Sequence, residues 1–136
     1  DPISRARLWD VIHQQADSGV GILLSTHYMQ EAEQCDRLVV MNLGRVVAEG
    51  TLADIIGDTT AVEIETNSWA SAFAALDAHG LPVSLSGAHV RVADTKPDTV
   101  EDVLREAHVQ AKIRKVPATL EETLTVLSRD PKRVGP

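Results

Sequence analysis

The pattern of apolar and polar positions divides the chain into two parts, with the change after residue 57. In the first part, residues 3–16 carry apolar side chains such as Leu8 and Ile12 at helical spacing, which predicts a helix with one apolar face. Residues 21–25 then form a short apolar run without alternation, a pattern typical of a strand covered on both faces. We therefore expect a helix followed by a buried strand.

Shorter elements complete the first part of the chain. Residues 29–34 can form two turns of helix, and a second apolar strand is expected at 38–41. Turn residues around Gly44 lead into a further strand-like run at 45–50, so the sequence predicts a hairpin with this glycine in the left-handed region. A short helix ended by glycine is expected at 51–57.

The second part of the chain has the pattern of a small α+β unit. Apolar and polar residues alternate in four segments, which predicts four strands. Apolar residues at helical spacing predict one helix between the first and second strands and another between the third and fourth. The expected order is β-α-β-β-α-β plus a final helix, which is the split βαβ or ferredoxin-like arrangement. The strands are expected at 61–66, 83–86, 89–92 and 111–116. Helices are expected at 69–79 and 97–107, and a final helix opens at 119 with Leu120, Leu124 and Leu127 on its inner face.

Charged residues on these strands match the pairing expected in this arrangement. In this arrangement the first strand lies between the third and the fourth, so acidic outward residues face basic ones on both sides, which is matched cross-strand pairing. We interpret this surface as a solvated face of the sheet rather than an anion-binding site. The residues concerned are Glu63 and Glu65, flanked by His89 and Arg91 and by Lys112 and Arg114. Thr119 and Glu122 have capping-box spacing at the start of the final helix.

Composition narrows the possible functions. The 136 residues carry a net charge of −7, and both parts hold more acidic than basic residues, which argues against a nucleic-acid partner. Hydrophobic residues make up 43% of the chain, yet no apolar run approaches the ~20 residues of a membrane span, and no export leader opens the sequence. The single Cys35 cannot form an internal disulfide, which fits a reducing cytoplasm.

Two residues of the first part stand out as candidates for chemistry. His27 follows the apolar run at 21–25, and open α/β sheets bind ligands at the carboxyl ends of such strands, although a polar residue that caps a strand end has the same position. Asp1 before Pro2 has the spacing of a helix N-cap. We interpret the carboxylates of Glu31, Glu33 and Asp36 as a solvated helix face rather than a metal site, so no metal ligand is expected.

Five short segments together resemble the last third of an ABC-transporter ATPase subunit, most closely the drug- and antibiotic-exporting branch with ABC-2-type membrane partners. They are Asp1-Pro2, Ser25-Thr26-His27, Glu31-Ala32-Glu33, Cys35-Asp36-Arg37 and the run from Gly44 to Gly50. Residues 59–130, with the ending Pro117-Ala118-Thr119-Leu120-Glu121-Glu122, resemble the C-terminal extension of that branch. The implied fold is an α/β piece of a P-loop NTPase sheet in 1–58, a ferredoxin-like domain in 59–130 and a frayed tail in 131–136.

The resemblance also implies roles for the two candidate residues. His27 matches the switch histidine that contacts the γ-phosphate of ATP, and Asp1 matches the last residue of the D-loop, which crosses the interface between two ATPase subunits. The longer subunit would use ATP and Mg²⁺, associate with a second ATPase subunit and an ABC-2-type permease, and lie in the cytoplasm at the inner face of the membrane. Its activity would be ATP hydrolysis coupled to export.

The chain departs from the family in the parts that hold nucleotide. It has no G-x-x-x-x-G-K-[ST] phosphate loop, no Leu-Ser-Gly-Gly run and no strand with the catalytic carboxylates. We therefore expect a piece of a longer subunit that neither binds nor hydrolyses ATP by itself and that self-associates through residues 3–26. The alternative is a regulatory or interaction module that binds a small effector or a second copy of itself.

Overall fold

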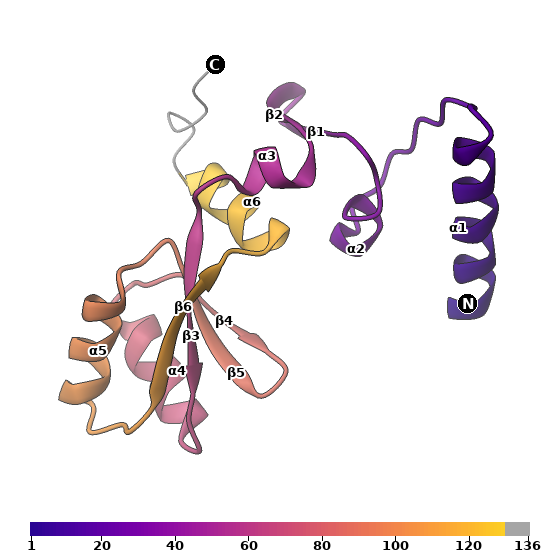
Figure 1. Ribbon diagram of the computed structural model, residues 1–136. Helices are drawn as coiled ribbons and strands as arrows, with labels where there is room; N and C mark the ends of the chain where they lie inside the picture. The colour runs from indigo at the N-terminus through magenta and orange to yellow at the C-terminus, as the bar shows by residue number, and fades with distance from the viewer. Residues whose placement is uncertain (130–136) are drawn as a thin grey trace.

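The computed structural model describes residues 1–129 and contains two separate sheets (Figure 1). The first part consists of α1 (Pro2–Asp17), α2 (Met29–Ala32), the hairpin strands β1 (Leu38–Asn42) and β2 (Arg45–Gly50), and α3 (Leu52–Ile56). The second part consists of β3 (Thr60–Glu65), α4 (Trp69–Ala78), β4 (Val83–Ser86), β5 (His89–Ala93), α5 (Pro97–Glu106), β6 (Lys112–Pro117) and α6 (Leu120–Arg129). The predicted mixed α/β class is confirmed, and the tail expected at 131–136 lies outside the described residues.

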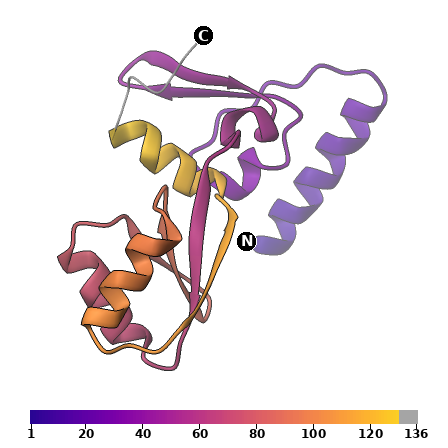
Figure 2. The ribbon, with the colours of Figure 1, turned by 60° about the vertical axis from the view of Figure 1, so that its left-hand side comes forward.

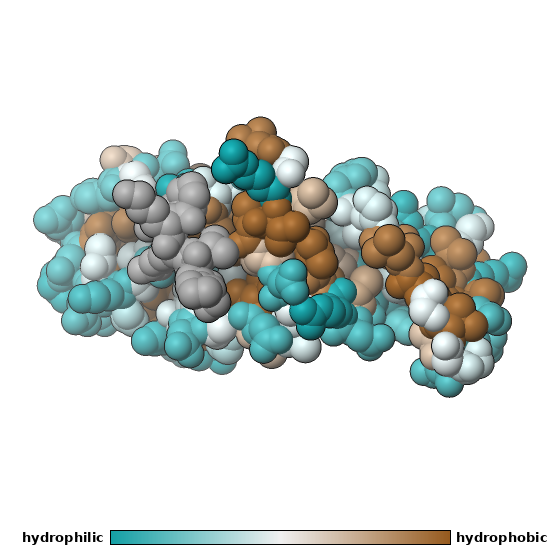
Figure 3. Space-filling view, turned by 90° about the horizontal axis from the view of Figure 1, so that it is seen from above, coloured by the Kyte–Doolittle hydropathy of each residue, from teal (hydrophilic) through white to brown (hydrophobic). Residues whose placement is uncertain are grey.

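Asp1 is the N-cap of helix α1, as the sequence predicts. The Ile3 N–H and the Ser4 hydroxyl donate hydrogen bonds to the two carboxylate oxygens of Asp1, at 3.1 and 3.0 Å, and Pro2 occupies the first helical position. The predicted apolar face forms but is poorly covered, because Leu8 remains 57% exposed while Trp9 is buried. Figure 3 shows apolar residues at the surface at this end of the molecule.

The strand predicted at 21–25 is wrong. This segment is extended without strand pairing, and Ile22 and Leu23 are 44% and 100% exposed. Backbone N–H and C=O groups of a strand need partners on neighbouring strands. Among residues 1–129, no strand lies alongside this segment, because one sheet consists of β1 and β2 and the other of β3, β4, β5 and β6. The apolar pattern indicates a segment suited to the interior of a sheet, but a strand forms only where neighbouring strands complete its hydrogen bonds.

The predicted hairpin is confirmed. Strands β1 and β2 pair antiparallel with Asn42 opposite Arg45, so two residues form the turn. Leu43 and Gly44 both have positive φ, 49° and 74°, as the two central residues of a type I′ turn require. Thr51 and Asp54 then form a reciprocal capping box at the start of α3.

The four-stranded sheet has the order β4-β5-β3-β6, and all of its neighbours are antiparallel. Strand β3 therefore lies between β5 and β6, as the split βαβ arrangement predicts. Helices α4 and α5 cover one face (Figure 2), where the fully buried side chains of Val62, Ile64, Val90 and Val92 form the core with residues of both helices. Helix α6 contacts β5 and α3.

Two predicted helices differ in detail from the structure. Helix α2 has a single turn, Met29–Ala32, rather than the two turns expected at 29–34. The helical spacing of Trp69, Phe73 and Leu76 predicts that these residues share one face of a helix, but Trp69, the first residue of α4, is 51% exposed. The buried positions of this helix are Ala72 and Leu76. No helix within residues 1–129 has both the length and the apolar character needed to cross a membrane.

Candidate functional site

His27 lies in the segment between α1 and α2, and its side chain is exposed. The prediction that it follows a buried strand is wrong within the described residues, because no strand precedes it. Its imidazole packs beside Tyr28, with the two ring centroids 4.2 Å apart and the planes tilted by 34°. The ring therefore has an aromatic neighbour and an open side.

The backbone around His27 is held by its neighbours. The Thr26 hydroxyl donates to Glu31 Oε2 at 2.5 Å and accepts from the Tyr28 N–H at 3.0 Å. Arg5 of α1 pairs with Glu31, with 3.5 Å between Nε and Oε1, and its guanidinium carbon lies 4.9 Å from the centre of the Tyr28 ring, within reach of a cation–π interaction. These contacts join the His27 segment to both α1 and α2.

The sequence suggested that Glu31 belongs to a solvated helix face, and this interpretation is wrong. Its side chain is 18% exposed because it is enclosed by Arg5 and Thr26, whereas Glu33 and Asp36 are exposed. Sequence reasoning missed Arg5 and Thr26 as partners, because the first contact depends on how α1 lies against α2. Within residues 1–129, no group of three or more His, Cys, Asp or Glu side chains is placed to hold a metal ion.

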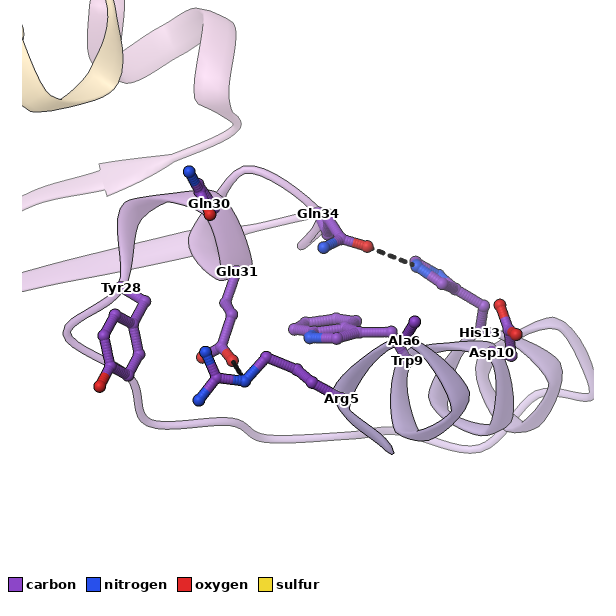
Figure 4. Close-up of a pocket in the computed structure, with 9 residues that line it drawn as sticks. All are labelled: Arg5, Ala6, Trp9, Asp10, His13, Tyr28, Gln30, Glu31 and Gln34. Carbon is purple, nitrogen blue, oxygen red and sulfur yellow. Dashed lines mark hydrogen bonds and ion pairs between the residues drawn. The ribbon is translucent and has the colours of Figure 1, made fainter. Parts of the chain in front are cut away.

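A cavity of about 310 Å³ separates α1 from α2 next to this cluster (Figure 4). Arg5 and Trp9 extend from α1 toward Tyr28 and Glu31, and His13 Nε2 lies 3.3 Å from the Gln34 side-chain oxygen at the far end. Neither His27 nor Asp1 lines this cavity. The structure thus brings His27 close to Tyr28, but it records no contact between His27 and Asp1 among the described residues.

Cys35 is partly buried at the end of this region. Its thiol donates a weak hydrogen bond to the Glu31 carbonyl oxygen at 3.6 Å. Burial raises the pKa of the thiol, and the carboxylates of Asp36 and Glu31 raise it further. A thiol in this environment stays protonated and unreactive at neutral pH.

The charged face of the four-stranded sheet is only partly solvated. Arg91 is 8% exposed, because α6 covers it, and Nη1 donates to Glu63 Oε2 at 2.9 Å. Nε and Nη2 of Arg91 donate to Glu122 Oε1 at 3.1 and 2.9 Å, and Nη2 also donates to the Pro117 carbonyl oxygen at 3.2 Å. Exposed Arg114 forms an ion pair with the same Glu63 from β6. The cross-strand pairing is as expected, but the solvated-face interpretation is wrong at Arg91.

The capping box at the start of α6 contributes to this network. Glu122 Oε1 accepts the Thr119 N–H at 3.0 Å, and the Glu122 N–H donates to the Thr119 hydroxyl at 3.1 Å, so the predicted motif is confirmed. Glu122 thus caps the helix and neutralises Arg91 with one carboxylate. The motif indicated the cap, but only the packing of α6 on β5 shows that the carboxylate is buried.

The side chains present do not by themselves fit a bound triphosphate. Both carboxylate oxygens of Asp1 accept hydrogen bonds from the first turn of α1, and a carboxylate repels phosphate. His27 is exposed and provides a single imidazole. A nucleotide site that includes these residues needs groups from a longer protein or a second subunit.

Comparison with known proteins agrees with the resemblance seen in the sequence. The chain is 33% identical over 147 aligned positions to the daunorubicin resistance ATP-binding protein DrrA3 of Streptomyces coeruleorubidus, covering 98% of the chain and 46% of that protein. It is 45% identical over 56 residues to the daunorubicin/doxorubicin resistance ATP-binding protein DrrA of Streptomyces peucetius, covering 40% of the chain and 17% of that protein. The Nod factor export ATP-binding protein I of Mesorhizobium japonicum matches 94% of the chain at 30% identity, over 38% of its own length. No family model matches the chain.

These matches define a class of protein. The chain belongs to the ATP-binding proteins of ABC transporters. It corresponds to the C-terminal part of such a protein, and its relatives support the drug-export branch. The chain spans less than half the length of the curated relatives it matches.

Proposed function

We propose that this chain is the part of an exporter's ATP-binding subunit that supplies the switch histidine, part of the D-loop and a C-terminal domain. The observation that carries the proposal is the segment around His27, whose backbone is fixed by the Thr26–Glu31–Arg5 contacts while its imidazole stays exposed. A fixed backbone with an open ring is the arrangement needed to present one hydrogen-bond donor to a group outside the chain.

The proposed role of His27 follows from the chemistry of phosphoryl transfer. A neutral imidazole donates one N–H to a phosphate oxygen, and the transfer depends on positioning and charge stabilisation more than on covalent help. In the complete subunit, His27 would face the phosphate of a bound ATP, whose charge Mg²⁺ would help to neutralise. Asp1 remains the cap of α1 there and contributes the end of the D-loop at the interface with a second subunit.

The chain alone is expected to bind no nucleotide. Calorimetric titration with Mg-ATP should give no saturable heat up to millimolar nucleotide, because the chain has no phosphate loop and the Asp1 carboxylate is committed to its helix cap. A micromolar dissociation constant would contradict this part of the proposal.

The role of His27 is tested in the full-length subunit. His27→Ala should lower kcat by about 10² to 10³, since one positioned group that stabilises the transition state contributes on this order, and the affinity for ATP should change far less. His13→Ala is the matched control, because His13 is also exposed and lies outside the His27 segment. An unchanged kcat in His27→Ala would contradict this role and would indicate that His27 is a structural residue.

The second part of the chain is proposed to be a ferredoxin-like domain. The order β4-β5-β3-β6, the antiparallel pairing and two helices on one face support this assignment. In the complete transporter, the subunit would lie at the cytoplasmic face of the membrane and pair with an ABC-2-type permease and a second ATP-binding subunit.

An alternative function is a regulatory or interaction module, in which the second part of the chain binds a small effector or a second copy of itself. Independently of this alternative, we propose that the chain self-associates through residues 3–26, because the side chains of Leu8, Ile22 and Leu23 are exposed. Light scattering should show a dimer or larger species, and a chain without residues 1–58 should be a monomer. A monodisperse full chain at high concentration would contradict self-association.

A further inference from the structure

His27 is the middle residue of a turn that a neighbouring side chain closes. The Tyr28 N–H donates a hydrogen bond to the Thr26 hydroxyl oxygen at 3.0 Å, which is the pattern of an ST turn from Thr26 to Tyr28. A side chain that bonds the backbone two residues later stabilises the local backbone without help from helix or sheet. The backbone from which the His27 imidazole projects is therefore held by the Thr26 hydroxyl.

The Thr26 hydroxyl is itself held by Glu31. It donates to Glu31 Oε2 at 2.5 Å, a hydrogen bond that the charge of the carboxylate strengthens. Thr26 is partly buried and the Glu31 side chain is 18% exposed, so water competes little for this contact. Because the hydroxyl proton points at Glu31, a lone pair of the same oxygen is left for the Tyr28 N–H. Glu31 thus orients the group that closes the turn around His27.

Helix α1 completes this support through Arg5 (Figure 4). Arg5 Nε lies 3.5 Å from Glu31 Oε1, so each carboxylate oxygen of Glu31 has its own partner. The Arg5 guanidinium carbon also lies 4.9 Å from the centre of the Tyr28 ring, and that ring packs beside the His27 imidazole. The placement of α1 therefore affects His27 by two routes, through the Glu31 carboxylate and through the Tyr28 ring.

The bond to Thr26 distinguishes Glu31 from a residue that only joins two helices. The ion pair of Arg5 with Glu31 would by itself connect α1 to α2. The hydrogen bond from Thr26 adds nothing to that connection, and its effect falls on the turn around His27. Glu33, two residues later, is exposed and has no side-chain hydrogen bond or ion pair within residues 1–129, which makes it a matched control.

We propose that Glu31 is a positioning residue for His27: acting through the Thr26 hydroxyl, it holds the imidazole in the direction from which it meets a phosphate oxygen. Arg5 keeps the Glu31 carboxylate in place. This inference rests on the proposed role of His27 and names what determines the orientation of that residue. Because Arg5 belongs to α1, His27 is correctly placed only while α1 lies against α2.

The first experiment follows the turn in the complete ¹⁵N-labelled chain, without nucleotide, by amide hydrogen exchange of Tyr28. Thr26→Val removes the hydroxyl and keeps the shape of the side chain, whereas Thr26→Ser keeps the hydroxyl. Exchange at Tyr28 should be at least about fivefold faster in Thr26→Val and in Glu31→Ala, as expected for the loss of one hydrogen bond. Thr26→Ser and Glu33→Ala should leave it unchanged. Unchanged exchange in Glu31→Ala would overturn the proposal.

The second experiment measures ATP turnover in the full-length subunit. Thr26→Val and Glu31→Ala should each lower kcat at least about tenfold while KM for ATP stays within about twofold, and Thr26→Ser should keep most of the activity. Thr26→Val leaves the Arg5–Glu31 pair intact, so it tests the turn even where Glu31→Ala loosens α1. Adding Thr26→Val to His27→Ala should lower kcat no further, because both changes remove the same contribution. An equal further loss would show a general structural role and overturn the proposal.

The outcomes separate this inference from the proposed function. An unchanged kcat in His27→Ala refutes the proposed role of His27, and with it any positioning of that residue for turnover. A large loss of kcat in His27→Ala together with an unchanged kcat in Thr26→Val refutes only the positioning by Glu31 and leaves the role of His27 in place.

Discussion

The two arginines that flank Glu63 provide a direct test of the buried charge network. Arg91 and Arg114 stand opposite Glu63 on neighbouring strands, and both form ion pairs with it. Their side chains differ in exposure, at 10% for Arg91 and 72% for Arg114. The substitutions Arg91→Met and Arg114→Met each remove one cation and keep a long apolar stem.

The expected losses of stability differ because only one of these cations is buried. Arg91→Met leaves Glu122 buried with the Thr119 N–H as its remaining partner, and breaking a buried ion pair from one side costs about 3–5 kcal/mol. Arg114→Met removes an exposed pair, worth about 0–1 kcal/mol. With an m value of about 1.5 kcal/mol/M, Arg91→Met should lower the urea midpoint by about 2 M or more.

The measurement is urea unfolding of both variants at pH 7, followed by far-ultraviolet circular dichroism. Equal m values in the variants and the original chain would show that the midpoints report stability. Equal destabilisation by the two substitutions, or a loss below about 1 kcal/mol for Arg91→Met, would refute the buried network.

Three further predictions concern pH, thiol reactivity and folding. The hydrogen bond from Arg114 holds the pKa of Glu63 below its ordinary value of 4.5. The ionised Glu63 carboxylate therefore stabilises the fold above pH 4.5, and this contribution is lost as the pH falls through the lowered pKa. Glu63→Gln should flatten this part of the curve of unfolding free energy against pH. Because burial and nearby carboxylates raise the pKa of Cys35, its alkylation by iodoacetamide at pH 8 should be several times slower than that of glutathione, and an equal rate would contradict this environment. Residues 59–130 made alone should unfold cooperatively with heat, since β3 to β6 and α4 and α5 build one core, and a disordered spectrum would show that this unit needs the first part.

Local signals were sufficient to predict most helices and turns. The cap at Asp1, the left-handed glycine at Gly44 and the capping box at Thr119 and Glu122 depend on residues within a few positions of one another, and the structure has all three. The expected sheet order came from the β-α-β-β-α-β arrangement, and the charges of opposite sign on neighbouring strands match it.

The missed features depend on contacts between distant segments. Residues 21–25 have the composition of a buried strand, but a strand exists only where other strands complete its hydrogen bonds. The burial of Arg91 depends on how α6 packs across β5, and the enclosure of Glu31 depends on how α1 lies against α2. For the same reason, the sequence suggested His27 as a candidate but not the cluster that fixes the backbone beside it.

The connection between the two sheets has a mechanical consequence. Only residues 57–59 separate α3 from β3, and both ends of this connection are anchored: the Gly57 N–H donates to the Ala53 carbonyl oxygen at 2.8 Å, and the Ala118 N–H donates to the Thr59 carbonyl oxygen at 3.0 Å. Helix α3 also contacts α6. A connection that is this short and hydrogen-bonded at both ends leaves little freedom between the two sheets. We therefore expect the hairpin and the four-stranded sheet to move as one rigid unit, so that a displacement of the hairpin also displaces the sheet.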